Sequence, residues 1–316
     1  MIIPLHNRRE LISYTLDSVR PERHAGVRLQ VIVVDDGSTD NGGDFVESQY
    51  PWVDVIRQPS RGASAARNCG LEHATGTFVL YLDSDDLVEE GFFEPRMAAL
   101  EGHPSAAGAY GPWDVFESDG AFAESTVRPR HGRYPIVAEV DSSGHLRRLL
   151  RGWYIVGPAT LWRRDVLRDV GGHDPTLIIN QDVELMFRIL TTTCGIVGVD
   201  APRALTRQHG GARQGLATSP DAVRQVAELR RRFRAELERL GIFDEQLRRA
   251  LAEYAFDSWA HFKGVAPEES HDLLLLSRDL WPEMNVRGGA LYRALGVVLG
   301  PARATIVKER LRRLIS

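Results

Sequence analysis

The stretch that decides the fold is FVLYLDSDD, at residues 78–86. Five apolar residues suited to a buried strand are followed at once by three acids, Asp83, Asp85 and Asp86. Like charges crowded together at the end of a strand repel one another unless a cation or a hydrogen-bond donor compensates them. Because ligands of open α/β sheets bind beyond the carboxyl ends of the strands, this stretch predicts a buried strand with a polar site at its end.

A second run, VIVVDDGSTD at residues 31–40, has the same form and carries Asp35, Asp36 and Asp40. Up to about residue 216, short apolar runs alternate with helix-like stretches, which predicts an α/β sheet. The expected strands are residues 2–3, 31–34, 53–56, 78–82, 106–110, 154–162 and 196–199. The expected helices are one capped by Asn7 and those of residues 60–74, 87–100 and 181–191.

Residues 217–316 have a helical pattern throughout, so we expect two domains, residues 1–216 and residues 217–316. We interpret the arginine-rich run at residues 230–234 as a solvated helix face. The basic and apolar stretch at residues 291–313 fits either a helix on an anionic membrane surface or a packed terminal helix. Residues 111–143, rich in proline, glycine and charge, are expected to form a flap or hairpin.

The composition is that of an ordinary globular protein, with 43% hydrophobic and 26% charged residues among 316. Its net charge of -4 gives no reason to expect nucleic acid as a partner. The two cysteines, Cys69 and Cys194, make no disulfide framework. No run approaches the roughly 18 apolar residues of a spanning helix, and the start MIIPLHNRRE lacks the pattern of a signal peptide. We therefore expect a cytoplasmic protein.

The acids of residues 83–86 predict a site for a hard divalent cation. Asp83 and Asp85, separated by the small Ser84, can reach one Mg²⁺ or Mn²⁺ and leave positions for water and phosphate. The structural alternative is that Asp85 or Asp86 caps a following helix. Capping explains one acid and leaves the other two unexplained.

Other chemistries of acidic α/β proteins fit less well. A phosphoacceptor receiver domain needs a lysine on a later strand, and this chain has lysine only at Lys263 and Lys308. A dinucleotide site needs G-x-G-x-x-G and a P-loop needs G-K-[ST], and the sequence contains neither motif. A nucleotidyltransferase remains open on the acids alone.

A set of motifs in one order extends over about residues 1–216. They are MIIPLHNR, VIVVDDGSTDNG, RGASAARNCGLEHATGTFVLYLDSDD, GPATLWRRDVLRDVGGHDPTLIINQDVELMFRIL and TRQHGG. Together they resemble the inverting glycosyltransferases of family 2, which have the GT-A fold. The resemblance implies a Rossmann-like mixed sheet flanked by helices, with an all-helical C-terminal extension. Members of that family have further apolar residues before the first strand, so we expect the natural start to lie upstream of Met1.

The resemblance implies a nucleotide-sugar site built from several motifs. Its donor-side residues would be Pro4, His6, Asp35, Asp36, Arg67, Asp83 and Ser84, with one of Asp35 and Asp36 accepting from the base or ribose. Asp85 would bind the metal directly, and His209 in TRQHGG would bind the metal or the diphosphate. Asp86 would be an additional acid that caps a helix or supports the metal ligands.

The resemblance also implies an acceptor side. Asp182 matches the second acid of the family's Glu-Asp pair and is the expected base, while Gln181 stands where the first acid would be. Glu184 is the second candidate for the base. Gly157, Pro158 and Trp162 would shape the acceptor cleft, and Trp113 and Trp153 would stack on sugars or lie in the core.

The expected function is therefore transfer of a sugar from a nucleotide-diphospho-sugar, with UDP as the expected carrier, to an acceptor hydroxyl. The reaction would depend on Mn²⁺ or Mg²⁺ and invert the anomeric carbon. The acceptor, a polysaccharide, a lipid-linked glycan or another hydroxyl compound, is not identified by the motifs. Gln181 leaves open a non-catalytic nucleotide-sugar-binding or assembly subunit. The C-terminal helices would serve the acceptor, a homodimer or a peripheral membrane contact.

Overall fold

The structure is a computed structural model that describes residues 1–24, 26–117, 126–129, 136–138, 140–193, 195–208 and 219–282. The chain divides into two compact units. The first consists of Met1–Leu149 and Trp153–Gly215, and the second of Leu150–Gly152 and Leu216–Ser316. All strands of the described residues belong to the first unit.

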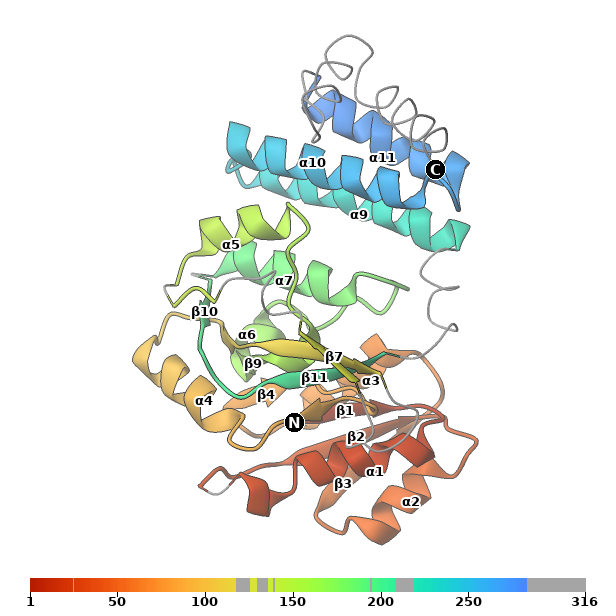
Figure 1. Ribbon diagram of the computed structural model, residues 1–316, viewed down its shortest axis with the longest axis vertical. Helices are drawn as coiled ribbons and strands as arrows, with labels where there is room; N and C mark the ends of the chain where they lie inside the picture. Colours follow the sequence, from red (N-terminus) through yellow and green to blue (C-terminus); the bar gives the residue numbers. More distant parts are fainter. Residues whose placement is uncertain are drawn as a thin grey trace. The chain divides into compact units, whose positions relative to one another are not determined.

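Three parallel strands form the first sheet, in the order β1-β2-β3 (Figure 1). These strands are β1 (Ile2–Leu5), β2 (Val31–Asp36) and β3 (Val53–Gln58), and the neighbouring helices are α1 (Arg9–Ser18), α2 (Gly42–Gln49) and α3 (Ala63–His73). Every residue of β1 and β2 is buried, as expected for parallel strands covered on both faces. Helix α3 packs on β1 so closely that a Cβ at Gly70 would lie 2.3 Å from Cγ2 of Ile2. The two acids Asp35 and Asp36 are the last residues of β2.

Two four-stranded mixed sheets complete the first unit, in the orders β10-β6-β9-β4 and β5-β11-β7-β8. Their strands are β4 (Phe78–Leu80), β5 (Leu87–Val88), β6 (Gly108–Tyr110), β7 (Trp113–Glu117), β8 (Thr126–Pro129), β9 (Thr160–Arg163), β10 (Ile196–Gly198) and β11 (Ala204–Gln208). The helical elements are η1 (Pro21–Arg23), α4 (Phe93–Gly102), α5 (Ser142–Leu149), η4 (Gly157–Ala159), α6 (Arg164–Asp169) and α7 (Gln181–Thr192). An isolated parallel bridge between Ile2 and Tyr81 connects the first sheet to the segment that precedes the acids. The expected hairpin is present, since β7 and β8 pair antiparallel.

Some expected elements are wrong. The helix expected over residues 87–100 is a short strand, β5, followed by α4, because Leu87 and Val88 pair with β11 and are therefore extended. Asn7 does not cap α1: its φ is +51°, and Asp40 Oδ2 instead accepts a hydrogen bond of 2.9 Å from the Arg9 amide. The strand expected over residues 154–162 is shorter, because the turn η4 precedes β9.

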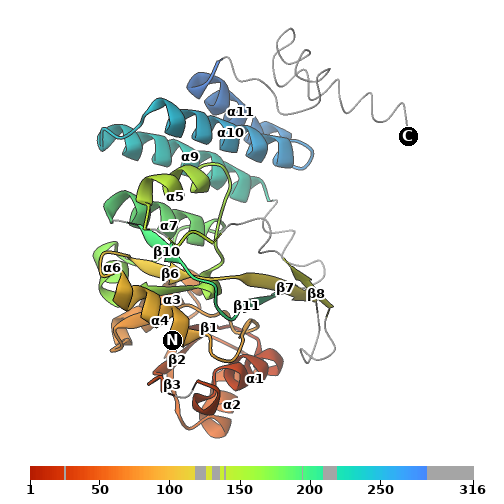
Figure 2. The same ribbon diagram turned by 60° about the vertical axis from the view of Figure 1, so that its left-hand side comes forward.

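The described residues of the second unit form three helices that lie side by side, α9 (Pro220–Arg239), α10 (Glu245–Phe262) and α11 (Pro267–Leu280) (Figure 2). Two of them begin with a side-chain cap, since the Ser219 hydroxyl accepts from the Ala222 amide and the Asp244 carboxylate from the Leu247 amide. The apolar residues Val226, Leu229, Phe233 and Leu237, three and four residues apart along α9, are buried. The helical C-terminal extension is thus confirmed for its described residues.

The arginine run of α9 is only partly a solvated face. Arg231 and Arg234 form ion pairs with Asp272 and Asp279 of α11. Arg230 is buried, and its guanidinium carbon lies 3.7 Å from the ring centroid of Tyr254. Within the described part of the chain, no helix combines the length and the apolar character needed to span a bilayer. Residues 291–313 lie outside the described residues.

Candidate active site

Three carboxylates meet just beyond β4. One oxygen from each of Asp83, Asp85 and Asp86 lies within 4.8 Å of the others. The side chain of Asp83 is 26% exposed, whereas Asp85 and Asp86 are buried. Carboxylate oxygens are the ligands that Mg²⁺ and Mn²⁺ prefer, and burial makes the mutual repulsion of these acids costly. The donor set therefore fits a hard divalent cation.

Protein donors surround the same acids. Nη2 of Arg67 lies 2.5 Å from Oδ1 of Asp83, and Nε of Arg8 lies 3.6 Å from Oδ2 of Asp85. Arg67 is buried, which disfavours its charge, but the nearby acids outweigh this and raise the pKa of its guanidinium above the ordinary value. Sequence reasoning missed Arg8, although it is the last residue of the quoted motif MIIPLHNR.

Asp86 has a structural contact that differs from the expected helix cap. Its Oδ1 accepts a hydrogen bond of 2.8 Å from the backbone amide of Arg207, in β11. Its own amide donates to the Asp83 carbonyl at 3.0 Å, which closes the turn of the acidic segment. The buried Arg207 side chain also donates through Nε to the Asp85 carbonyl at 3.0 Å. Asp86 thus connects the acidic turn to β11, and the TRQHGG motif contains its partner.

The acids at the end of β2 organise two loops. Asp36 accepts hydrogen bonds of 2.8 Å from the backbone amides of Arg61 and Gly62, at the start of α3. Asp35 Oδ1 accepts from the Ser38 amide at 2.9 Å. Nδ1 of the exposed His6 lies 2.8 Å from the Asp36 carbonyl oxygen. The structure thus brings His6 to the carboxyl end of β2, while Pro4 is buried inside β1, opposite Val34.

The first turn of α7 lies next to Arg67. Gln181 accepts from Nη1 of Arg67 at 3.4 Å and donates through Nε2 to the Leu177 carbonyl at 2.7 Å. The neighbouring Asp182 has a side chain that is 41% exposed, and its Oδ1 lies 3.5 Å from Nε2 of His173. Desolvation by the surrounding protein raises the pKa of Asp182, but His173, Arg67 and the Gly157 amide outweigh this effect, so that the pKa lies below the ordinary value.

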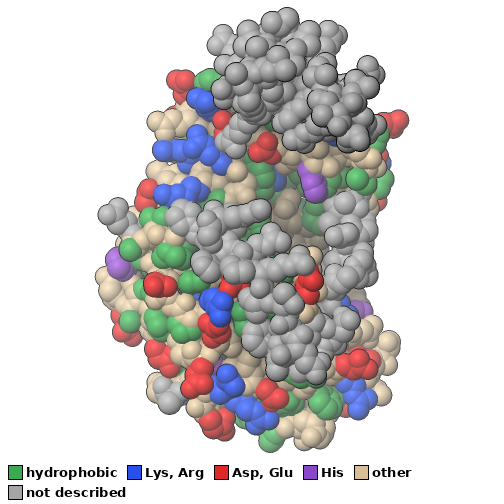
Figure 3. Space-filling view, in the orientation of Figure 1, with side chains coloured by type: hydrophobic (Ala, Val, Ile, Leu, Met, Phe, Trp, Pro, Cys, Tyr) green, Lys and Arg blue, Asp and Glu red, His purple; other side chains and the backbone are tan. Residues whose placement is uncertain are grey.

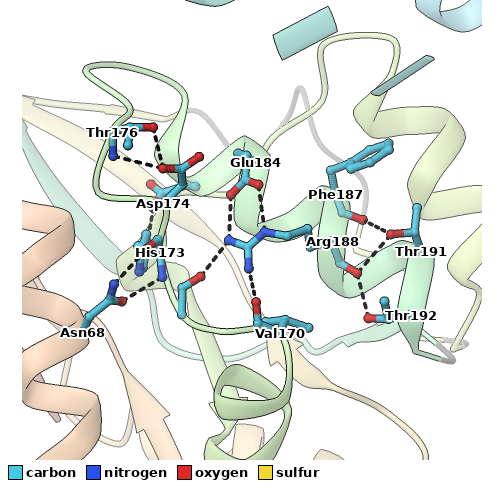
Figure 4. Close-up of polar contacts among 12 residues, drawn as sticks. Asn68, Val170, His173, Asp174, Thr176, Glu184, Phe187, Arg188, Thr191 and Thr192 are labelled. Carbon is cyan, nitrogen blue, oxygen red and sulfur yellow. Dashed lines mark hydrogen bonds and ion pairs between the residues drawn. The ribbon is translucent and has the colours of Figure 1, made fainter. Parts of the chain in front are cut away.

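Glu184, the second candidate for the base, is held by another residue of the same helix (Figure 4). Arg188 donates to both of its carboxylate oxygens, at 2.8 and 2.6 Å, and Glu184 is buried. Arg188 also donates to the carbonyls of Val170 and Gly172. Since both oxygens of Glu184 bind this arginine, the geometry favours Asp182 over Glu184 as a base.

The remaining predicted residues divide between the site and the core. Gly157, in η4, lies beside Asp182, because a Cβ at this position would be 3.5 Å from its Oδ1; Pro158 follows it and is buried. Ser84 is buried between Asp83 and Asp85. Trp113 and Trp153 are buried, which favours the core over a sugar face for both, and Trp162, expected to shape the acceptor cleft, is buried in β9. His209 lies outside the described residues.

The surface charges are mixed. In the view of Figure 3, acidic and basic side chains of the described residues intermingle over the visible face. Such mixing agrees with the small net charge of -4.

The fold is that of the GT-A glycosyltransferases. The first 349 residues of Staphylococcus aureus TarS, in a crystal structure with UDP-GlcNAc, superpose with a TM-score of 0.69 at 18% identity, covering 99% of this chain and 90% of that one. The mannosyltransferase PcManGT from Pyrobaculum calidifontis, in complex with GDP-Man and Mn²⁺, gives a TM-score of 0.50 at 16% identity and covers 90% of this chain and 87% of that one. The expected fold class is confirmed.

Residues 1–171 match the family described as Glycosyl transferase family 2, and the chain belongs to this family. It is 32% identical to the uncharacterized glycosyltransferase YibD of Escherichia coli over 173 residues, which are 53% of this chain and 48% of that protein. It is 30% identical to the pre-mycofactocin glycosyltransferase of Mycobacterium tuberculosis over 203 residues, 60% of this chain and 38% of that protein. The matched regions thus span about half or less of these curated relatives.

Proposed function

We propose that the chain is a metal-dependent glycosyltransferase that transfers a sugar from a UDP-sugar to an acceptor hydroxyl with inversion. One observation carries the proposal. The guanidinium of Arg67 binds Asp83 of the acidic cluster through Nη2 and Gln181, next to Asp182, through Nη1. Arg67 therefore lies between two parts of the site. One is the acidic cluster, which is suited to a metal ion and a diphosphate, and the other is the helix turn that carries the candidate base, Asp182.

The cation would be held by Asp83 and Asp85, with Asp86 as the third nearby carboxylate. When bound, Mn²⁺ or Mg²⁺ supplies positive charge that stabilises a departing diphosphate. His209 remains a candidate for the same diphosphate or metal. TarS binds UDP-GlcNAc and PcManGT binds GDP-Man with Mn²⁺, which supports a nucleotide-sugar donor and a divalent cation for this chain as well.

The nucleoside would lie at the carboxyl ends of β1 and β2. His6 is exposed there and offers an imidazole ring for stacking on a base. Pro4, Asp35 and Asp36 shape this end of the sheet, and one of the two acids would accept a hydrogen bond from the base or ribose. Arg67 would donate to the donor nucleotide from the same side.

The transfer itself requires a base on the acceptor side. Asp182 has a pKa below the ordinary value, so it is ionised at neutral pH and can accept a proton, although the lowered pKa makes it a weaker base than an ordinary aspartate. It would remove the proton of the acceptor hydroxyl as that oxygen attacks the anomeric carbon. The bond from this carbon to the diphosphate oxygen breaks in the same displacement, UDP leaves, and the configuration inverts. Gly157, Pro158 and Gln181 would line the acceptor's approach.

We assign these steps to a catalytic domain of residues 1–216. The helical domain of residues 217–316 would serve the acceptor, a homodimer or a peripheral membrane contact. We propose the cytoplasm as the location of the reaction.

A thermal-shift screen of nucleotide sugars with and without Mn²⁺ tests the donor, because a ligand that binds only the folded state raises its melting temperature. We expect a shift with a UDP-sugar that requires the cation, followed by slow release of free UDP. Binding without any UDP release, with or without candidate acceptors, would instead indicate a non-catalytic subunit. Pyrophosphate release from a nucleoside triphosphate would indicate a nucleotidyltransferase.

A further inference from the structure

A buried histidine lies directly behind the candidate base. The His173 ring is in the core, and its Nε2 is 3.5 Å from Oδ1 of Asp182. Neither ring nitrogen of His173 has a hydrogen-bond partner among the described residues, so Asp182 is the polar group to which the ring is presented. A buried polar group without a partner is costly, and such groups call for an explanation. Hydrogen bonds of catalytic groups are often long without substrate and shorten in the complex.

The backbone of His173 is fixed from α3. Its amide donates to Oδ1 of Asn68 at 2.8 Å, and Nδ2 of Asn68 donates to its carbonyl at 2.8 Å (Figure 4). The preceding Gly172 has a φ of +69°, and a Cβ there would lie 2.4 Å from Oδ1 of Asn68. Only glycine fits both the backbone conformation and this close approach. The side-chain amide of Asn68 thus pairs with both backbone groups of His173, as a residue of a neighbouring β-strand would.

The same loop is fixed a second time from the helix that carries Asp182. Arg188 of α7 donates to the carbonyls of Val170 and Gly172 and is itself held by Glu184. The ring of Tyr81 contacts the His173 ring edge to face, with centroids 4.7 Å apart. The loop therefore cannot shift relative to α7 without breaking these contacts, and the distance from the imidazole to Asp182 is set by the fold.

We propose that His173 is a positioning residue whose neutral imidazole donates a hydrogen bond from its Nε2–H group to Asp182 and so fixes that carboxylate for proton removal from the acceptor. The inference rests on the proposed function. The charged and titratable groups that face the pair are Arg67, Arg188 and Tyr81. Burial and the two arginines keep the ring neutral by lowering its pKa, against the opposing effect of Asp182. A neutral ring has one N–H, and with Nδ1 facing no partner that proton belongs on Nε2.

Nitrogen-15 NMR of the histidine rings in the full chain tests the pair without any ligand. We expect His173 to be a neutral Nε2–H tautomer from pH 6 to 8 and its ring signals to move in the variant Asp182→Ala. A mixture of tautomers, or signals unchanged by Asp182→Ala, would overturn the proposal. The internal control is His24, a buried histidine whose Nε2 lies 3.0 Å from the Ser18 carbonyl oxygen. Its ring signals should not move in Asp182→Ala.

Kinetics separate positioning from packing. The assay is UDP release from the UDP-sugar found by the thermal-shift screen. The variant His173→Phe keeps a ring against Tyr81 but removes the N–H group. It should lower kcat about tenfold or more and leave KM unchanged, because loss of a group that orients a functional side chain has effects of this size. His173→Gln keeps an N–H donor and should recover part of the rate. His24→Gln, which removes a buried histidine elsewhere, should lower the melting temperature and leave kcat unchanged.

The two proposals fail differently. If Asp182→Asn keeps full turnover, the base of the proposed function is wrong, whatever His173 does. If Asp182→Asn is inactive while His173→Phe has wild-type kcat, only the role of His173 is wrong.

Discussion

Nη2 of Arg67 lies 2.5 Å from Oδ1 of Asp83, so a buried arginine compensates part of the acidic cluster before any cation arrives. A second arginine, Arg8, lies 3.6 Å from Asp85. The two guanidinium groups offset part of the negative charge, so the protein can fold around these acids without a metal ion. A divalent cation would take over this compensation and leave the guanidinium groups able to bind a diphosphate.

Removing Arg67 should therefore make the protein more dependent on the cation. We expect Arg67→Met to lower the melting temperature without metal, because Asp83 loses its partner, and to increase the rise in melting temperature that Mn²⁺ produces. Differential scanning fluorimetry with a Mn²⁺ series measures both. Arg23→Met changes an exposed arginine and is the control. A Mn²⁺ response no larger than that of the wild type would show that Arg67 and the cation do not compensate the same charges.

We expect Asp182 to have a chemical role and Glu184 a structural one. Asp182→Asn should keep the melting temperature and abolish sugar transfer. Glu184→Gln weakens the pair with Arg188, whose side chain is 27% exposed, and should lower the free energy of unfolding by about 2 kcal/mol, while the remaining folded protein loses far less activity than Asp182→Asn does. Urea unfolding and UDP release measure the two effects. The assignment is wrong if the two variants show the reverse pattern.

Asp86 should matter for stability more than the sequence suggested. Asp86→Ala leaves the buried Arg207 amide without its acceptor and should cost about 1–3 kcal/mol of unfolding free energy. Asp86→Asn keeps an oxygen that can accept this hydrogen bond and relieves charge repulsion, so its loss should be much smaller. Equal losses in the two variants, measured by urea unfolding, would mean that the hydrogen bond to Arg207 is not the cause.

Two buried histidines should make stability fall in mild acid. Burial lowers the pKa of His145 and of His173 below the ordinary value of 6.5. The unfolded chain then binds more protons below pH 6.5, so the free energy of unfolding is largest above this pH and declines as pH falls toward the folded pKa values. Urea unfolding from pH 7.5 to 5 should show the decline, and His145→Phe should make it shallower. An unchanged slope in that variant would remove His145 from the explanation.

The sequence predicted the strands of the first two sheets and their acidic ends, because these depend on local patterns, whereas no expected strand corresponds to β5, β7, β8 or β11 of the third sheet. Apolar runs followed by acids identified β2 and β4 and the residues that follow them. The segment at Leu87–Val88 was misread as a helix because its extended form depends on a partner strand, β11, more than a hundred residues away. Local pattern cannot reveal such a pairing.

Sequence reasoning missed Arg8, Arg207 and His173, which lie inside the quoted motifs. Arg8 and Arg207 contact acids from another part of the chain, and the backbone of His173 is held by the distant Asn68. Their polar character was visible, whereas burial and the identity of the partner were not. The buried position of His173 in particular follows from its contact with Asn68, which a helical pattern around residues 60–74 does not indicate.

The most direct test of the central claim is calorimetric titration of UDP into the wild type and into Asp85→Asn, each with Mn²⁺ and with EDTA. We predict that the wild type binds UDP only with Mn²⁺ and that Asp85→Asn loses at least about tenfold in affinity, while the exposed control Asp169→Asn binds as the wild type does. Equal UDP affinity in EDTA and in Mn²⁺, unaltered by Asp85→Asn, would contradict a metal-dependent nucleotide site at these acids.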